Sequence, residues 1–429
     1  MIEKLKVLDD LKIDKNKPLI VAVSGGVDSM VLIDLLYKAN YKVIITHFNH
    51  QTRKENEKER DLVISYAIDK NIPYFVYSLK IRSGNFHEKA RNERYLKLKE
   101  VAKTHKTKYI VTAHHLDDLA ETVLMKITRG SNLYGYAGIH KIVNEDDFIY
   151  LKPLLENTKQ EIIDYAFKNE IKYLEDTSNY KDSYMRNRYR HTIIPIMKQE
   201  NSNLLNSFNN YHNQVANAFN YIRKNAIKHL DGLKIKLNTF NKQDIAIKNE
   251  MIAYLLEQYE IDFTYDLVIK INQILSNNKP NQTYNLSRNY VLIKSYNEAF
   301  IEEKTNKISF EVPLKMKENT LPNMKKITLL NNISHNNINK IKICYNELTL
   351  PLIARTRKNG DVVKFKYGHK KVKDLLIDLK IPRHLRDDLI VITDSSNTIL
   401  YIENAYLNET LGNENNIYIK IGEDKWTRF

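Results

Sequence analysis

The chain has only one cysteine, Cys344, among its 429 residues. A single thiol excludes an intramolecular disulfide framework, a zinc site built from several cysteines and a Cys-x-x-Cys redox pair. Long hydrophobic runs are also missing, because no stretch approaches the roughly 18 apolar residues that a membrane span needs. The opening segment, residues 1–17, is charged throughout and lacks the apolar core of a signal peptide. We therefore expect a cytoplasmic protein with no membrane partner.

The length and the charge of the chain set the next bounds. The 429 residues are about three times the usual domain size, so two or three domains are expected. Lys and Arg number 67 against 52 Asp and Glu, which leaves a formal net charge of +15. A positive excess favours a polyanionic partner. The sequence is also rich in Lys, Asn, Ile and Tyr, a bias that an AT-rich genome produces by itself. The charge is therefore informative only where it clusters beside a motif.

Hydrophobic patterning predicts strands that alternate with helices in the first 200 or so residues. Short apolar, β-branched runs favour buried strands at 18–23, 42–47, 74–79 and 109–113. Helical spacing follows these runs at 30–38, 55–71, 86–105 and 116–129. This alternation predicts an α/β domain over residues 1–204, with a parallel sheet and helices on both faces. A small helical domain over 205–310 and a C-terminal α+β domain over 311–429 are expected to follow.

The strongest local signal is a six-residue loop between an apolar strand and a helix. It consists of Ser24, Gly25, Gly26, Val27, Asp28 and Ser29. Two glycines allow backbone N–H groups to converge on an anion, two serines add hydroxyl donors, and the helix points its positive end at the loop. Asp28 would be repelled by a bare phosphate, so its presence suggests a Mg²⁺ ion that bridges the carboxylate and the phosphates. The loop lacks the lysine of G-x-x-x-x-G-K-[ST] and the spacing of G-x-G-x-x-G.

A second polar cluster begins at the end of a later strand and enters a helix. Asp117 and Glu121 are four residues apart and share a helix face, and Asp118 lies beside them. His114 and His115 precede these acidic residues. Three carboxylates beside two histidines at the carboxyl end of a strand suit the binding of a cation or an amine. Acidic residues at a helix N-terminus also complement the helix dipole without any further role. The position on the same sheet as the six-residue loop favours the functional interpretation.

The six-residue loop resembles the SGGxDS signature of the ATP pyrophosphatases, a family that adenylates a substrate oxygen on a Rossmann-like sheet with Mg·ATP. Other segments resemble one branch of this family, the tRNA(Ile)-lysidine synthetases. These segments are His47–His50, Ala90–Tyr95, Met125–Ser131, Glu175–Asn179 and Arg186–Arg190. The resemblance covers the first 195 residues, and the run Gly368–Asp387 resembles the C-terminal domain of the same branch. The middle of the chain matches in placement and character, without a motif.

The resemblance implies a ligase that acts on the CAU anticodon of tRNA(Ile) in two steps. ATP adenylates the C2 oxygen of the wobble cytidine and pyrophosphate is released. The ε-amine of free L-lysine then attacks C2 and expels AMP, which leaves lysidine. ATP and Mg²⁺ are thus the implied cofactors, and tRNA(Ile) and L-lysine are the implied partners. The resemblance is also compatible with a homodimer.

The same resemblance suggests a role for each candidate residue. The loop from Ser24 to Ser29 is expected to bind ATP, with Asp28 as the metal ligand. A cation is needed beside the α-phosphate, and Arg91, Arg94 or Arg129 is expected to supply it. Asp117, Asp118 and Glu121 are expected to hold the substrate lysine, and His114 to accept a proton. The predicted catalytic set is therefore Asp28, Arg91, His114, Asp117, Asp118 and Arg129.

Basic residues in the last part of the chain are the candidates for tRNA binding. They are Arg355, Arg357, Lys370, Lys371, Lys373, Arg383 and Arg386. Basic side chains contact phosphates and make binding dependent on salt. A solvated surface is the alternative for any one lysine, whereas the cluster favours contact with tRNA. Aromatic side chains are expected to stack on the splayed anticodon bases.

Three other functions compete with this prediction. A thiolating ATP pyrophosphatase usually needs catalytic cysteines or several cluster ligands, and Cys344 lies outside the predicted nucleotide domain. An amidating relative usually carries a glutaminase domain with its own nucleophilic cysteine, and no such segment is visible. A non-catalytic RNA-binding protein on a decayed nucleotide fold would not retain both the loop and the acidic cluster.

Overall fold

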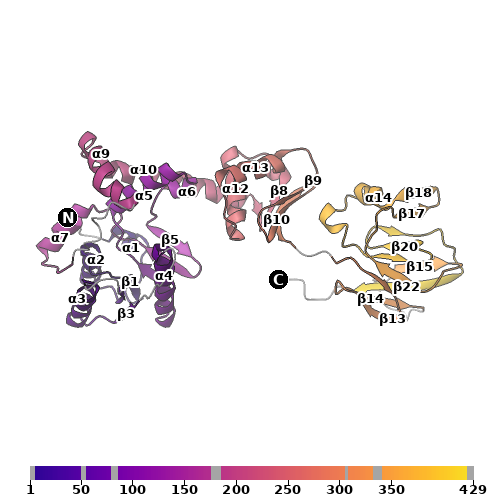
Figure 1. The fold of residues 1–429 in the computed structure, drawn as a ribbon, viewed down its shortest axis with the longest axis horizontal. Coiled ribbons are helices and arrows are strands. Elements are labelled where there is room, and N and C mark those ends of the chain that lie inside the picture. Colours follow the sequence, from indigo (N-terminus) through magenta and orange to yellow (C-terminus); the bar gives the residue numbers. More distant parts are fainter. Residues whose placement is uncertain are drawn as a thin grey trace. The chain divides into compact units, whose positions relative to one another are not determined.

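A computed structural model describes residues 5–49, 55–78, 86–174, 185–304, 308–331 and 341–422. The chain divides into two compact units, residues 1–222 and 223–429, and Figure 1 shows the helices and strands of each. The division into three domains stays a prediction. His50 and the segment Glu175–Asn179, which carry part of the family resemblance, lie outside the described residues.

Among the described residues, the first unit is built on a six-stranded sheet in the order β3-β2-β1-β4-β6-β5. Neighbouring strands run parallel except for β5, which pairs antiparallel with β6. The strands are β1 Leu19–Ala22, β2 Val43–Asn49, β3 Tyr74–Ser78, β4 Tyr109–Val111, β5 Ile142–Glu145 and β6 Phe148–Leu151. The predicted parallel sheet is therefore confirmed, with one antiparallel edge strand added to it.

Helices cover both faces of this sheet, and the side chains of β1 alternate between the two faces. Leu19 and Val21 belong to a buried cluster that includes residues of α2 (Val27–Lys38), α3 (Glu55–Asp69) and α7 (Lys159–Lys168). Ile20 points to the opposite face, where it joins a cluster with residues of α4 (Phe86–Thr104). The remaining helices of this part are α1 Lys6–Asp10, α5 Leu116–Arg129, α6 Leu133–Tyr136, α8 Met185–Arg188, a π-helical turn Tyr189–Ile193, α9 Ile194–Glu200 and α10 Leu204–Lys228.

The strand order places the connections that follow β1 and β4 next to each other, at the carboxyl ends of these two strands. β1 pairs with β2 on one side and with β4 on the other, with Ile20 opposite Ile110 and Val21 opposite Val111. The chain therefore moves outward in opposite directions from β1 and β4. In open α/β sheets, ligands bind in the crevice at such a switch point, outside the carboxyl ends of the strands. The six-residue loop follows β1, and the acidic cluster follows β4. The fold thus brings together the two motifs that the sequence analysis singled out.

The second unit contains an α+β part that follows the long helix α10. Its helices are α11 Leu237–Phe240, α12 Ile245–Gln258 and α13 Tyr265–Ser276. They share a core with a five-stranded antiparallel sheet formed by β7 Leu230–Asp231, β8 Lys234–Lys236, β9 Asn281–Asn285, β10 Tyr290–Ser295 and β11 Glu298–Glu303. The expected helices are present, but the sheet was not anticipated. Strands such as β9, with the sequence NQTYN, lack the apolar alternation that announces a strand.

The last part of the second unit is rich in β-structure, as predicted. Two sheets in the orders β12-β16-β19-β20-β21 and β13-β14-β22-β15 surround a common core. Their strands are β12 Glu311–Pro313, β13 Lys317–Thr320, β14 Lys326–Leu330, β15 Ile341–Tyr345, β16 Ile353–Arg355, β19 Val391–Thr393, β20 Ile399–Ile402, β21 Tyr406–Leu407 and β22 Asn415–Gly422. A smaller core joins β17 Val362–Phe365, which pairs with β18 Gly368–Lys371, to α14 Val372–Asp378.

A membrane crossing finds no support in the helices of the described residues. None of them combines sufficient length with sufficient apolar character to cross a bilayer.

Candidate functional site

The six-residue loop turns sharply between β1 and α2. Gly25 has φ +96°, a conformation that favours glycine, and a Cβ atom there would lie 3.2 Å from Cβ of Glu59. The Ser29 hydroxyl accepts hydrogen bonds from the backbone N–H groups of Ser24 (3.2 Å) and Gly25 (3.3 Å). Gly26 is the N-cap of α2, so the loop lies at the positive end of the helix. Val27 is buried in the core, and only its backbone is available to a ligand.

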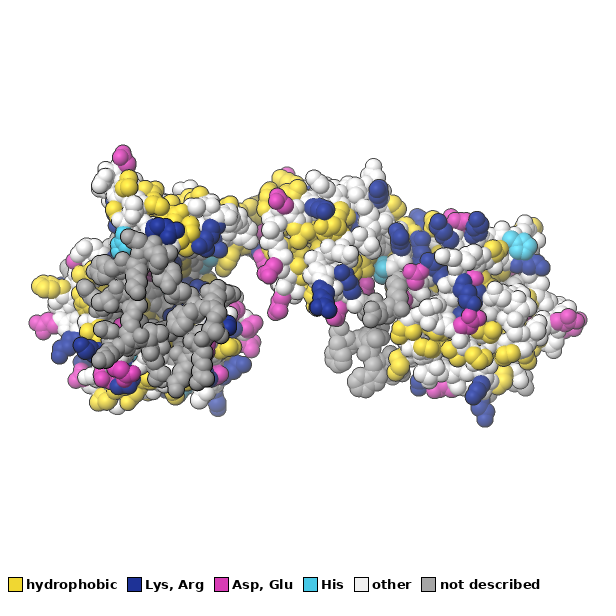
Figure 2. All heavy atoms as spheres, in the orientation of Figure 1, with side chains coloured by type: hydrophobic (Ala, Val, Ile, Leu, Met, Phe, Trp, Pro, Cys, Tyr) yellow, Lys and Arg dark blue, Asp and Glu magenta, His cyan; other side chains and the backbone are white. Residues whose placement is uncertain are grey.

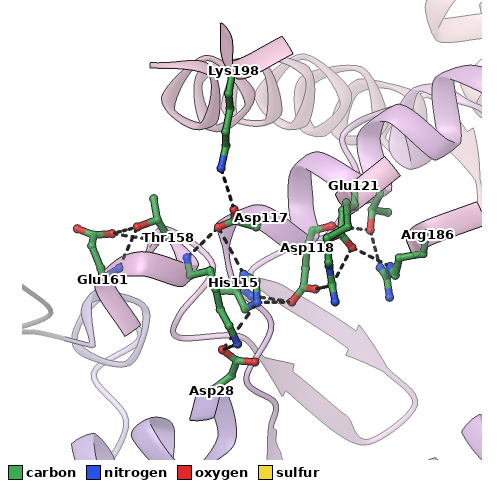
Figure 3. Close-up of polar contacts among 12 residues, drawn as sticks. Asp28, His115, Asp117, Asp118, Glu121, Thr158, Glu161, Arg186 and Lys198 are labelled. Atoms are coloured by element: carbon green, nitrogen blue, oxygen red, sulfur yellow. Dashed lines mark hydrogen bonds and ion pairs between the residues drawn. The ribbon is translucent and has the colours of Figure 1, made fainter. Parts of the chain in front are cut away.

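His115 lies at the centre of the acidic cluster, between the loop and α5. It is the N-cap of α5, and its backbone N–H donates to Asp118 at 3.2 Å. Its imidazole lies 3.8 Å from Asp28, 3.8 Å from Asp117 and 3.4 Å from Asp118. Figure 3 shows the ring between the carboxylate of α2 and those of α5. From the sequence, the neighbouring His114 is the expected proton acceptor.

Lys159, in the first turn of α7, connects the two motifs. Its ammonium donates to Asp28 at 2.6 Å, and its backbone N–H donates to Asp117 at 2.8 Å. Thr158 caps the helix in a reciprocal arrangement with Glu161, which fixes the position of this turn. A second ammonium, that of Lys198, lies 3.4 Å from Asp117. Both carboxylates therefore already contact ammonium groups of the chain itself.

Glu121 and Asp118 differ from Asp117 because arginines of the α8 region already pair with them. Arg190 contacts Glu121 at 2.6 Å and Asp118 at 3.4 Å, and Arg186 contacts Glu121 at 3.1 Å. The side chain of Glu121 is only 1% exposed, and burial raises its pKa although the arginines act in the opposite direction. Glu121 thus holds the helices together and is not open to a substrate ammonium, contrary to the expectation. Figure 3 shows Arg186 pointing toward it.

A cavity of about 790 Å³ lies beside this cluster. Its wall includes His114 and Arg91, together with Lys152 at the end of β6. His114 has its Nδ1 atom 2.9 Å from the Thr112 hydroxyl, and burial lowers the pKa of His114 to about 4. An imidazole with so low a pKa holds a proton too weakly to take one from an ammonium. The expected role of His114 as proton acceptor stays a prediction, which this low pKa does not favour.

The three candidate arginines occupy different places. Arg91 lines the cavity from α4, and Arg94, on the same helix, has a pKa lowered by burial. Arg129 is the exposed last residue of α5, and the twelve residues from Asp117 correspond to roughly 18 Å of helix rise. Arg129 is therefore not brought together with the carboxylates, and among the three we retain Arg91.

The predicted tRNA-binding residues separate into exposed and paired groups. Lys371, Lys373 and Arg383 are exposed, and Figure 2 shows Lys and Arg side chains gathered in the region of α14. Arg357 pairs with Asp387 at 2.5 Å, and Lys370 pairs with Asp378. Arg386 is half-buried and donates to the carbonyl of Ile381 at 2.8 Å.

Arg355 does not fit the expected contact with tRNA. Its side chain is 0% exposed and bonds to both carboxylate oxygens of Asp361, at 2.9 and 2.8 Å. A guanidinium that is enclosed in this way stabilises the domain and cannot reach a phosphate. The adjacent hairpin β17–β18 offers surface residues that the sequence analysis missed, among them Lys364, Lys366 and the 99% exposed Tyr367.

The residues at the loop fit a magnesium ion held jointly with a nucleotide. Among the described residues, no group of three or more His, Cys, Asp or Glu side chains is arranged to hold a metal ion. Mg²⁺ commonly needs only one or two carboxylates, because phosphates and waters complete its shell. Asp28, whose side chain is 29% exposed, suits that requirement. When bound, such an ion would neutralise charge on the phosphates.

The loop, the switch-point crevice and the sheet order define a nucleotide-binding domain of the PP-loop class. A family model described as a PP-loop domain matches residues 2–197. A second model, described as a TilS substrate C-terminal domain, matches residues 352–420.

Curated relatives define the family more narrowly. A tRNA(Ile)-lysidine synthase from Aster yellows witches'-broom phytoplasma is 36% identical over 97% of this chain and 96% of the relative. A bifunctional protein TilS/HprT from Listeria innocua is 32% identical over 90% of this chain, which spans 64% of that longer protein. The chain belongs to the tRNA(Ile)-lysidine synthase family. A crystal structure of a TilS C-terminal domain aligns with 27% of this chain and 96% of its own, at 24% identity and a TM-score of 0.23.

Proposed function

We propose that this protein ligates L-lysine to C2 of the wobble cytidine in the CAU anticodon of tRNA(Ile), in an ATP-dependent reaction. Membership of the family over nearly the whole chain carries the proposal. The arrangement of Asp28, His115 and Asp117 at one crevice supports it, because it places the nucleotide loop within reach of amine-binding carboxylates. In this proposal the reaction takes place in the cytoplasm, and the protein binds ATP, Mg²⁺, L-lysine and tRNA(Ile). A homodimer is a further part of this proposal.

The first step forms a bond between the cytidine C2 oxygen and the α-phosphorus of ATP. Pyrophosphate leaves with the electron pair of the broken P–O bond. The loop from Ser24 to Ser29 supplies hydroxyl and N–H donors to the phosphates, and Asp28 would hold Mg²⁺ there. Arg91, which lines the adjacent cavity, is the cation proposed for the charge that builds on the phosphorus.

In the second step the ε-nitrogen of lysine bonds to C2, the C2–O bond breaks and AMP leaves. The ammonium must lose one proton before the attack and the nitrogen loses another as the C–N bond forms. We assign the holding of the ammonium to Asp117 and Asp118, whose side chains are 19% and 15% exposed, because the side chain of Glu121 is only 1% exposed. His115 is the imidazole that lies within 4 Å of these carboxylates, and it replaces His114 as the candidate for receiving a proton.

The experiment is incubation of the protein with ATP, radiolabelled lysine and an unmodified tRNA(Ile) transcript. We expect label on the tRNA, and consumption of ATP with no labelled tRNA would overturn the proposal. Asp28→Asn should reduce labelling by about a thousandfold, since metal-held phosphates dominate phosphoryl-transfer catalysis. Asp164→Asn, a change of an exposed carboxylate on α7, serves as the matched control and should label normally.

A further inference from the structure

Lys152 is a buried cation without a matching anion. It follows β6 and is 9% exposed, and its backbone N–H donates to the carbonyl of Lys141 at 3.0 Å. The described residues include no carboxylate or carbonyl that hydrogen-bonds to its ammonium. A buried ammonium is normally paired, because its removal from water is costly. An unpaired one that lines a cavity points to a ligand that supplies the missing negative charge.

The charged groups around Lys152 add further positive charge to the cavity and do not neutralise the ammonium. Arg91 on α4 lies close enough to oppose it electrostatically, and Lys126 on α5 and Arg186 on α8 line the same cavity. The carboxylate in the described wall is that of Glu145 on β5, whose partner Lys99 holds it at 2.8 Å.

Two histidines of the wall carry no compensating charge. Burial lowers the pKa of both His114 and His140, and the nearby ammonium of Lys152 lowers each further. The cavity therefore presents cations without free anions.

Aromatic rings form another part of the wall. Tyr95 and Tyr150 have ring centroids 5.2 Å apart, and Tyr134 stacks on His140 at 4.0 Å with 9° between the rings. Burial raises the pKa of Tyr150 to about 12, so its phenol stays neutral at physiological pH. A cavity whose wall carries both cations and flat rings suits a nucleotide, which has both a phosphate and a base.

We propose that Lys152 and Arg91 form the phosphate-binding part of this cavity, and that Lys152 takes up a proton when a nucleotide phosphate binds. The identity of the nucleotide rests on the proposed function, in which the phosphate belongs either to ATP or to the tRNA backbone. Burial, assisted by Arg91, lowers the pKa of Lys152 to about 8, so the amine is partly neutral before the ligand arrives. A phosphate beside the ammonium favours the protonated form.

The linkage gives a definite sign to the dependence of affinity on pH. The bound state has the higher pKa, so affinity is full below about pH 8 and falls as pH rises toward the pKa of the bound state. From a free-state pKa of about 8, affinity should fall about tenfold between pH 7 and pH 9. Binding at pH 8 should take up about half a proton per complex.

The test measures binding by titration calorimetry between pH 7 and pH 9, in buffers of different ionisation enthalpy. Two probes separate the sources of phosphate: α,β-methylene-ATP with Mg²⁺, and an anticodon stem-loop RNA of tRNA(Ile). Lys152→Met should weaken the responding probe about 10- to 100-fold at pH 7, since it removes a charged contact to the phosphate. Lys152→Arg should keep most of the affinity and lose the dependence on pH, because a guanidinium stays protonated throughout.

Lys103→Met, an exposed change on α4 outside the cavity, is the control and should match the wild type. A response with the ATP analogue assigns the site to the cofactor, and a response with the RNA assigns it to the tRNA backbone. Affinities that neither Lys152 variant changes, for either probe, would overturn the inference. Wild-type labelling of tRNA with lysine is measured in parallel, so failure of this inference can be told from failure of the proposed function.

Discussion

Two buried cations of this protein have opposite surroundings. Arg355, on β16, is fully enclosed and bonds to both oxygens of Asp361. Lys152, after β6, is also buried, yet the charged neighbour that acts on its pKa is another cation, Arg91. Arg355 belongs to the most basic part of the chain, whereas nothing in the sequence sets Lys152 apart. Pairing, more than burial or local charge, therefore distinguishes a cation that stabilises the fold from one that is available to a ligand.

Removing each cation in turn is the most direct test of this difference. Arg355→Met should lower the free energy of unfolding by about 3–5 kcal/mol, because it leaves the carboxylate of Asp361 buried without its partner. Lys152→Met should instead raise it by about 1–3 kcal/mol at pH 7, because it removes a buried charge that has no partner. Chemical denaturation of the full chain measures both. Equal losses of stability in the two variants would remove the distinction.

The acidic cluster offers the same contrast among carboxylates, with a smaller effect. Glu121→Gln should lower the free energy of unfolding by about 1–3 kcal/mol, since Arg186 and Arg190 lose a charged partner in a buried place. Asp117→Asn should change stability little and raise the KM for lysine about tenfold, as expected for loss of one charge-assisted contact. Thermal unfolding and the lysine-labelling assay, applied to both variants, separate the roles. The reverse pattern would assign the substrate to Glu121.

The smallest effect is expected from the exposed basic residues. Lys371→Ala combined with Lys373→Ala should weaken tRNA binding only a few-fold at moderate salt and reduce the salt slope by about 2. Filter binding over a range of salt concentrations gives both values. Lys370→Ala, which first has to lose its partner Asp378, should reduce the slope by less. An unchanged slope in the double variant would place the tRNA on another surface.

The parts of the site that sequence could predict are contiguous along the chain. The loop from Ser24 to Ser29 and the pair Asp117 and Asp118 each lie within a few consecutive residues, and the parallel sheet follows from the alternation of strands and helices. His114 and His115 show where this reasoning ends. Extended backbone sends successive side chains to opposite sides, so one ring faces the cavity and the other faces the carboxylates. A single sequence does not say which ring faces which side.

The remaining parts depend on contacts between distant segments. Arg190 closes on Glu121 from 69 residues away, and Lys159 reaches Asp28 across 131 residues. Arg355 looked like part of a basic surface because its neighbours in sequence are basic, but the fold turns it inward. Lys152 became visible only when β6 and α4 placed it beside Arg91 without an acid.

Lys159 contacts two carboxylates through two different groups, its side-chain ammonium and its backbone N–H. Its ammonium on Asp28 is the end of a side chain that is 38% exposed, and a bound metal ion would compete with it for the carboxylate. Its amide on Asp117 belongs to the first turn of a capped helix and stays in place when the side chain leaves. Under the proposed function, Asp28 would therefore exchange partners in each catalytic cycle while Asp117 keeps its position, so the nucleotide end of the crevice would adjust and the amine end would stay fixed.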